Sequence, residues 1–473
     1  MSSSESQPAK YPPPTPVYIL RGHASPVHAL HFYNQNARLV SGDADGWIIV
    51  WDMVSKRPTA AWKAHEGAIL NVRGVEFAPD DGNLGQERAE TENHGGDMLE
   101  KRVFTHGRDN ALRVWRINTK DEALLDKQLP VEENAAPKDR REPWLIYSIT
   151  VNTLNFCGFA LAFGPPRSHA TKPDDCYSEG GGSVQVSSFS ERRVHETSSE
   201  IFIAVPNALN TGGIDIFHLP SQKRVCMIYA EKSTKTGMVM ALEIFFSTTG
   251  DLYVVSGYED GQCMVHRQHG PVVVQEDTDT PSASAWTWNW QRIYTNRAHS
   301  QPVLSLDISP TKEYFLTSSA DANIVKHPLL GCDGPKSGDH MPLRVVNTKH
   351  AGQQGLRIRS DQKICVTAGW DGRARVYSCK TMKELAVLKW HSEGCFAIAL
   401  GDIQPDEQAT SKEVPTAHAT KPVVGKDENA TLVLRSHPGS LAAIKQQRTH
   451  KAQLTHWIAV GSKDGKISLW DIY

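Results

Sequence analysis

The chain has 473 residues, more than one average globular domain, so we expect two or three ordinary domains or one large repetitive domain. Its 39% of hydrophobic residues are enough to bury a large core, which excludes a small disulfide-stabilised protein. With 51 Lys and Arg against 53 Asp and Glu, the net charge of −2 excludes a strongly basic protein that binds nucleic acid directly through its phosphates.

The cysteines and the first residues give expectations about the compartment. The eight cysteines include no CxxC pair, so we expect reduced, mostly buried thiols and no zinc ribbon. Residues 1–16, rich in Pro and Ser, have no apolar stretch and are predicted to be disordered. Without a secretion signal or a run of about eighteen apolar residues, we expect a nuclear protein, or a cytoplasmic one, that does not contact membranes.

A pattern of strand, tight turn and strand recurs along the chain. It is clearest in residues 41–52 (SGDADGWIIVWD), 105–116 (THGRDNALRVWR) and 460–471 (VGSKDGKISLWD). Asp-Gly pairs supply tight turns, and the flanking β-branched and aromatic residues alternate with period two. The weaker copies, in chain order, are residues 206–219, 256–267, 317–328 and 367–378.

A small residue followed by His precedes most copies, as in Gly22-His23. Gly-His, about two strands and then Trp-Asp is the pattern of a WD-repeat blade. Seven copies predict an all-β fold, a seven-bladed WD-repeat β-propeller over residues 17–473. Because the end of the sequence completes only a third strand, residues 16–20 are predicted to supply the fourth strand of the last blade and close the ring.

Long insertions are expected, because the turns are about 70 residues apart and a compact blade needs only ~40–45. We call the four strands of a blade a to d, from the axis to the rim. The a–b and c–d connections then emerge on one face, and their polar composition predicts weak order. They are assigned to residues of about 79–101, 118–143, 165–199, 268–290, 329–341 and 403–452. The opposite face has only short b–c and d–a turns.

His, a hydroxyl residue, Asp and Trp recur at fixed places within the blades. A Ser-His-Asp nucleophilic site is one interpretation. An enzyme needs one such site, however, whereas these residues repeat, so we interpret them as a hydrogen-bonded structural staple in each blade. The two complete staples are His23, Ser41, Asp45 and Trp51, and His65, Thr105, Asp109 and Trp115.

Other copies depart from this pattern. His266, His327 or Tyr377 takes the place of the Trp, and Val460 takes the place of the hydroxyl residue. We expect those blades to be held more by apolar packing. No catalytic residue, metal site or cofactor site is predicted, and the run 461–466 is one residue too short between its glycines for a Walker A loop.

Without a catalytic set, we expect the chain to act by binding other proteins on the short-turn face. Trp and Arg are frequent anchors of interfaces. The candidate partner-binding residues are Arg108, Tyr258, Trp370, Trp390 and Lys463. For Trp370, packing on an adjacent blade is the alternative. The run Trp286, Trp288 and Trp290 is either a strand packed on its own blade or an aromatic patch for a partner.

Several runs resemble the fungal family of ASTRA-associated WD-repeat proteins. They are residues 18–23, 42–47, 105–110, 348–354, 368–373, 380–391 and 461–473. The resemblance implies a nuclear, non-catalytic scaffold of the ASTRA complex with a role in chromatin remodelling. It also implies contact with the Tel2-Tti chaperones, which serve large phosphatidylinositol-3-kinase-like kinases. We expect one copy of the chain within this hetero-complex.

Two alternatives stay open at this point. A general WD-repeat adaptor, like a G-protein β subunit or a ubiquitin-ligase adaptor, differs from this scaffold only in its partners. A propeller hydrolase would need converging carboxylates or a metal in the central channel.

Overall fold

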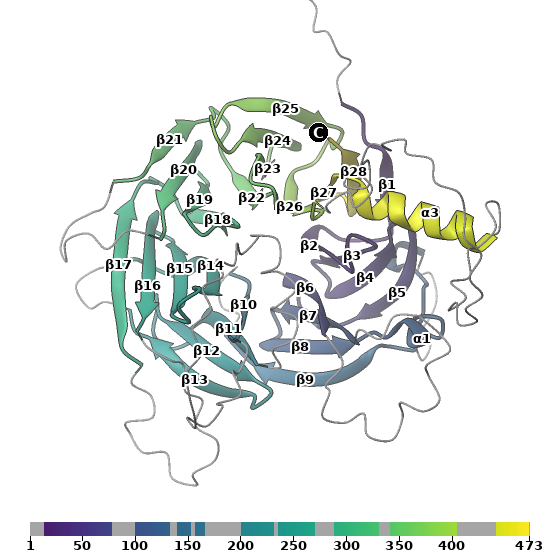
Figure 1. Cartoon of the computed structure of the whole chain (residues 1–473), viewed down its shortest axis with the longest axis horizontal. Coiled ribbons are helices and arrows are strands. Elements are labelled where there is room, and N and C mark those ends of the chain that lie inside the picture. Colours follow the sequence, from purple (N-terminus) through teal and green to yellow (C-terminus); the bar gives the residue numbers. More distant parts are fainter. Residues whose placement is uncertain are drawn as a thin grey trace, which may run out of the picture.

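Seven four-stranded antiparallel sheets are arranged as blades around a central axis in the computed structural model (Figure 1). The predicted seven-bladed β-propeller is therefore confirmed. Strand a of each blade lies next to the axis and strand d at the rim (Figure 1). The structure describes residues 14–77, 100–132, 140–152, 157–165, 200–230, 235–269, 288–330, 341–403 and 441–472.

The first three blades follow one another along the chain. Blade 1 consists of β2 (Val27–Tyr33), β3 (Arg38–Asp43), β4 (Trp47–Asp52) and β5 (Arg57–Lys63). Blade 2 consists of β6 (Ile69–Phe77), β7 (Glu100–Gly107), β8 (Ala111–Arg116) and β9 (Trp144–Thr150). Blade 3 consists of β10 (Ala160–Phe163), β11 (Ile201–Pro206), β12 (Ile214–Leu219) and β13 (Lys223–Ile228).

The next three blades have the same strand order. Blade 4 consists of β14 (Val239–Phe246), β15 (Leu252–Tyr258), β16 (Gln262–Gln268) and β17 (Trp290–Arg297). Blade 5 consists of β18 (Val303–Ile308), β19 (Tyr314–Ser319), β20 (Asn323–Pro328) and β21 (Arg344–Asn347). Blade 6 consists of β22 (Gln353–Ile358), β23 (Ile364–Gly369), β24 (Arg373–Ser378) and β25 (Glu384–Lys389).

Blade 7 joins the two ends of the described chain. It consists of β26 (Cys395–Leu400), β27 (Trp457–Ser462), β28 (Lys466–Asp471) and, as its outer strand, β1 (Tyr18–Arg21). The pairing of β1 with β28 is antiparallel, and the amide of Val17 adds a hydrogen bond of 2.7 Å to the carbonyl of Leu469. The predicted closure of the ring by an N-terminal strand is confirmed.

The hydrophobic core lies between neighbouring blades. In β4, Ile49 belongs to a buried cluster with blade 7, whereas Ile48 and Val50 belong to a cluster with blade 2. This alternation follows from the period of two in a β-strand, which sends successive side chains to opposite faces. Because both faces of a blade are covered, the central strands have continuous apolar sequences rather than alternating apolar and polar residues.

Within the described residues, helices occur in two of the long connections. The helix α1 (Thr119–Glu122) and the 3-10 turn Pro130–Glu132 lie in the c–d connection of blade 2. The helix α3 (Leu441–Leu454) lies in the a–b connection of blade 7. The expectation of weak order is wrong for this segment, because contacts with the propeller hold the helix that its Ala, Gln, Lys and Arg residues permit. Its last turn is attached to the propeller, because Trp457 Nε1 donates to the Ala452 carbonyl at 2.7 Å.

A β-bulge recurs near the start of strand a. In six blades the register with strand b shifts after the first paired residue, so that one residue of strand a is skipped. The six skipped residues are His28, Leu70, Met240, Leu304, Gln354 and Phe396. Bulges re-aim side chains, and these six lie where strand a leaves the short-turn face.

Candidate functional site

The staple of blade 2 contains the four residues that the sequence predicts. His65 Nδ1 lies 2.8 Å from Asp109 Oδ1, and its Nε2 lies 2.8 Å from Thr105 Oγ1. Trp115 Nε1 donates to the same hydroxyl oxygen at 3.0 Å. Burial lowers the pKa of His65 despite the neighbouring carboxylate of Asp109. A neutral imidazole that donates to Asp109 and accepts from Thr105 fits this network.

The staple of blade 1 uses a different aspartate from the predicted one. His23 lies 2.7 Å from Ser41 Oγ and 2.7 Å from Asp43 Oδ2, and Trp51 Nε1 donates to Ser41 at 2.9 Å. The predicted role of Asp45 is wrong, because Asp45 lies exposed at the tip of the turn, where it accepts from Ser25 Oγ. The completely buried Asp43 instead holds the turn by accepting two backbone amides at 3.0 Å each.

Blade 5 has a staple without tryptophan. His299 lies 3.1 Å from Asp321 and 2.8 Å from Thr317 Oγ1. His327 takes the tryptophan position, with its Nε2 2.9 Å from Thr317 Oγ1 and its Nδ1 2.9 Å from the hydroxyl of Tyr294. The staple therefore persists in this blade, because a second imidazole can take the hydrogen-bonding place of the indole.

Blade 7 restores the hydroxyl from the opposite strand. Val460 occupies the usual hydroxyl position on β27, and its cross-strand partner on β28 is Ser468. Ser468 Oγ lies 2.8 Å from His391 Nε2 and accepts from Trp470 Nε1 at 2.8 Å. The staple therefore persists here as well, with its hydroxyl on the neighbouring strand. In blade 6, an ion pair of Arg375 Nη2 with Asp371 Oδ2 at 2.5 Å accompanies the buried Tyr377.

Three of the five predicted partner-binding side chains are exposed on the short-turn face. They are Arg108, Trp370 and Lys463. Of the other two, the buried Tyr258 is wrong as a surface candidate. Tyr258 is 3% exposed in the core between blades 3 and 4, and Trp390 is half-buried in the core between blades 6 and 7.

The Trp370 side chain is about half exposed and is held in place by its neighbours. It is 49% exposed, and its Nε1 donates to Gln354 Oε1 at 2.7 Å. Its ring lies over Gly352, where a Cβ would come 2.2 Å from the ring, so a side chain larger than hydrogen would displace the indole. The neighbouring d–a turn places Glu393 3.8 Å from Lys463 Nζ. Trp370 and Lys463 thus border the same turn.

The six bulge residues form a rim around the channel on this face. All six are half-buried. The rings of His28 and Phe396, from blades 1 and 7, lie 5.8 Å apart, and Trp370 is bonded to the rim residue Gln354. Burial lowers the pKa of His28, and the positive charge of Arg108 acts in the same direction. The rim was missed by sequence reasoning, because only the bulge register identifies its members.

The tryptophan run supports the packed interpretation as far as it is described. Trp288 and Trp290 pack against the core between blades 3 and 4, and Trp290 Nε1 lies 2.9 Å from Cys226 Sγ. Trp286 lies outside the described residues.

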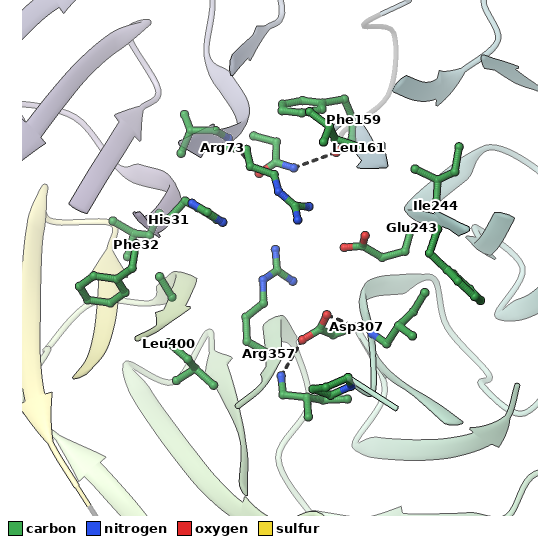
Figure 2. A pocket seen from close by; sticks show the side chains of 18 of the residues that line it. His31, Phe32, Arg73, Phe159, Leu161, Glu243, Ile244, Asp307, Arg357 and Leu400 are labelled. Carbon is green, nitrogen blue, oxygen red and sulfur yellow. Dashed lines mark hydrogen bonds between the residues drawn. The ribbon is translucent and has the colours of Figure 1, made fainter. Parts of the chain in front are cut away.

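A polar pocket lies on the axis of the propeller (Figure 2). Its volume is about 320 Å³. One residue of strand a from each blade lines it, at an equivalent position in the pairing with strand b. The seven residues are His31, Arg73, Leu161, Glu243, Asp307, Arg357 and Ala399. Ser309, Pro310 and Lys312 from the a–b connection of blade 5 also line it, so the pocket reaches toward the face of the long connections.

The charged groups of the pocket influence one another. Burial raises the pKa of Glu243 to about 7, aided by Asp307 and opposed by the two arginines. Burial lowers the pKa of His31 to about 3, and Arg73 and Arg357 act in the same direction. Burial also raises the pKa of Asp307, against the effect of Arg357. At neutral pH the pocket therefore holds two guanidinium groups and a neutral imidazole.

Two carboxylates thus converge in the channel, as a propeller hydrolase would require. Asp307, however, uses both oxygens to accept the amides of Ile308 and Ile358, at 3.0 and 2.6 Å. Among the residues that line the pocket, no hydroxyl is hydrogen-bonded to a histidine or a carboxylate. The arrangement is that of a charged binding pocket, without the nucleophile–base pair of covalent catalysis.

In the described part of the chain, no group of three or more His, Cys, Asp or Glu side chains is placed to hold a metal ion. None of the described helices has the length and apolar character needed to cross a membrane.

Comparisons with known proteins agree with this architecture. The family model described as "WD domain, G-beta repeat" matches residues 14–52, 290–325 and 434–471. A protein of Aspergillus niger named ASTRA-associated protein 1 is 50% identical over 476 residues, covering 100% of both chains. Proteins of the same name from Penicillium rubens and Verticillium alfalfae are 49% and 40% identical, covering 98% and 97% of this chain and 98% and 93% of their own.

Seven blades around an axis, with staples of histidine and hydroxyl groups, define a WD-repeat β-propeller protein. Identity of this extent over the full length places the chain more narrowly: it belongs to the family of ASTRA-associated protein 1.

Proposed function

We propose that this chain is a non-catalytic WD-repeat scaffold of the nuclear ASTRA complex. The observation that carries the proposal is the 50% identity over the whole chain to a protein named ASTRA-associated protein 1. The structure supports a binding role, since the short-turn face offers a half-buried rim of bulge residues beside the exposed Trp370. Rigid surfaces with exposed aromatic side chains are typical of protein interfaces.

The proposal includes a role in chromatin remodelling and a link to the Tel2-Tti chaperones and their large phosphatidylinositol-3-kinase-like kinases. Support comes from the family resemblance of the sequence runs. The net charge of −2 favours contact with other proteins over direct contact with nucleic acid. We propose that one copy acts within the hetero-complex.

Affinity purification of the tagged chain from nuclear and cytoplasmic extracts, followed by mass spectrometry, tests this function. We expect ASTRA subunits, Tel2-Tti chaperones and large kinases to be enriched from the nuclear extract. Recovery of none of these proteins, or of ubiquitin-ligase subunits in their place, would contradict the proposal and favour a general adaptor.

The same purification with variants tests the binding face. Trp370→Ala is expected to lower partner recovery at least severalfold while changing the free energy of unfolding by no more than about 1 kcal/mol. Trp144→Ala is the matched control, because Trp144 is 68% exposed at the start of β9, where the long c–d connection ends. Loss of partners with Trp144→Ala alone would place the interface on the other face.

A second pair of variants tests the rim. Met240→Glu places a charge on a half-buried rim residue, whereas Met341→Glu changes a residue that is 81% exposed in the c–d connection of blade 5. We expect only Met240→Glu to reduce partner recovery, because a buried charge without a partner opposes association. Equal recovery with both variants would exclude the rim from the interface.

A further inference from the structure

The axial pocket has more hydrogen-bond donors than acceptors. The Arg73 side chain has no hydrogen bond or ion pair in the described part of the chain, and the Arg357 side chain uses one N–H to donate to the Leu356 carbonyl at 2.7 Å. A guanidinium carries five N–H donors. Most of the donors of both arginines are therefore available to a molecule in the pocket.

The acceptors of the pocket are largely occupied. Both Asp307 oxygens accept backbone amides, as described above. The Asn71 oxygen accepts the Val72 amide at 2.9 Å, and His31 Nδ1 accepts the amide of Gly74 at 3.3 Å. Glu243 is the remaining carboxylate, and it forms no hydrogen bond within the described residues. An excess of donors favours a ligand rich in acceptor oxygens over an amine or a guanidine.

The position of the two arginines gives the shape of the ligand. They extend from β6 and β22 toward each other, with the Glu243 and Asp307 carboxylates beside them (Figure 2). No ion pair joins either guanidinium to these carboxylates in the described structure. A planar guanidinium group binds a phosphate-like oxyanion through two parallel N–H donors. Two guanidinium groups can bind one tetrahedral anion from opposite sides.

We propose that the axial pocket binds a tetrahedral oxyanion, such as sulfate, inorganic phosphate or the phosphate group of a larger molecule, between Arg73 and Arg357. The volume of about 320 Å³ exceeds that of the anion itself and leaves room for a small organic group. This inference is independent of the proposed scaffold function, since it concerns the channel and not the protein-binding face.

Glu243 makes the binding dependent on pH. With a pKa of about 7, it is mostly protonated at pH 6, when it can donate to the anion, and mostly charged at pH 8, when it repels the anion. Of the other titratable groups facing the pocket, His31, with a pKa of about 3, stays neutral over this range. Arg73, Arg357 and Lys312 are cations, and Asp307 is the second carboxyl group.

Isothermal titration calorimetry of the full chain with sodium sulfate tests the site. Sulfate is the first probe because it stays a dianion from pH 6 to pH 8, so its pH dependence reports the protein alone. We expect binding about tenfold tighter at pH 6 than at pH 8, which is the change in the protonated fraction of a group with a pKa near 7. Absence of binding at both pH values overturns the proposal, and this test needs no variant.

Variants then assign the residues. Arg73→Gln and Arg357→Gln are each expected to weaken sulfate binding at least about tenfold, whereas Arg344→Gln, an exposed arginine on β21, leaves it unchanged. Glu243→Gln is expected to bind sulfate at pH 8 as the unaltered chain does at pH 6, with no pH dependence. Unchanged binding by the Arg73→Gln/Arg357→Gln double variant, with unchanged melting, would show a non-specific surface effect and overturn the site.

A second ligand series separates the sources of the anion. Inorganic phosphate and glycerol 3-phosphate are titrated at pH 6 into the unaltered chain and into Arg357→Gln. Tighter binding of glycerol 3-phosphate supports the phosphate group of a larger molecule, and tighter binding of phosphate supports the free ion. Binding that Arg357→Gln does not weaken contradicts the proposal for either source.

Discussion

At the scale of single residues, Asp43 is the carboxylate on which the staple of blade 1 depends. Asp43→Ala removes the acceptor for His23 and for two turn amides inside the protein. We expect a loss of about 1–3 kcal/mol or more in the free energy of unfolding, because buried donors are left without partners. Asp45→Ala, at the exposed tip of the same turn, is the control for urea denaturation and is expected to cost less than about 1 kcal/mol. The reverse order of the two losses would contradict this assignment.

Ser468 gives a second test at the same scale. Ser468→Ala leaves His391 Nε2 and Trp470 Nε1 without their shared partner and is expected to cost roughly 1–3 kcal/mol. Val460→Thr returns a hydroxyl to the usual position on β27. The double variant is expected to recover part of the lost stability, measured as the melting temperature. A double variant less stable than Ser468→Ala would show that the two strands do not exchange this role.

These staple residues show how far the sequence predicts the site. Blade 2 is predictable because His65, Thr105 and Asp109 follow the repeat spacing. Blade 1 is not, because Asp43 and Asp45 both lie near the turn and only the folded turn shows which one points inward. The axial pocket is even harder to predict from the sequence, because residues such as Arg73 and Glu243 are separated by whole blades. In addition, the bulge register determines which residue of strand a faces the axis.

At the scale of elements, β1 closes the ring by its pairing with β28. Leu20 is 1% exposed within the core shared by blades 7 and 1, whereas Tyr18 on the same strand is 46% exposed. Leu20→Asp is expected to detach β1, since it buries a charge without a partner, and to lower the melting temperature strongly. Tyr18→Asp is expected to have little effect. Equal melting of both variants would mean that β1 contributes little to closure.

The helix α3 was less predictable than β1. The strand near the N-terminus follows from the need of the last blade for a fourth strand, a requirement of the whole ring. The segment 441–454 lies in a long polar connection, and its composition alone does not show that Trp457 and Asn36 attach its last turn to the propeller. Tertiary contacts, rather than local preference, decide whether such a short helix is stable.

At the scale of the whole molecule, buried histidines make stability depend on pH. Burial lowers the pKa of His31 and His106 to about 3 and of His266 to about 4, from 6.5. The unfolded chain binds these protons below about pH 6.5, whereas the folded chain does not until the pH is much lower. Stability is therefore lost as the pH falls from 6.5 toward 4. Glu243 and Asp307, whose pKa values are raised, act in the opposite direction.

Urea denaturation at pH 7 and pH 5 measures this balance, and we expect a lower midpoint at pH 5. His106→Phe removes one of the groups that bind a proton on unfolding. The new phenyl ring keeps the packing of the imidazole against Phe159. The variant should therefore lose roughly 2 kcal/mol less than the unaltered chain between the two pH values. An equal loss in both chains would show that His106 does not contribute.

The pairing of β1 with β28 also has a consequence for biosynthesis. A ribosome makes β1 before blades 1 to 6 and β28 after them, so those six blades can fold before β1 has its partner. During that interval the nascent polypeptide carries an unpaired edge at each side of an open arc. An unpaired strand edge can pair with another chain, so the open arc is prone to aggregation until β28 is made.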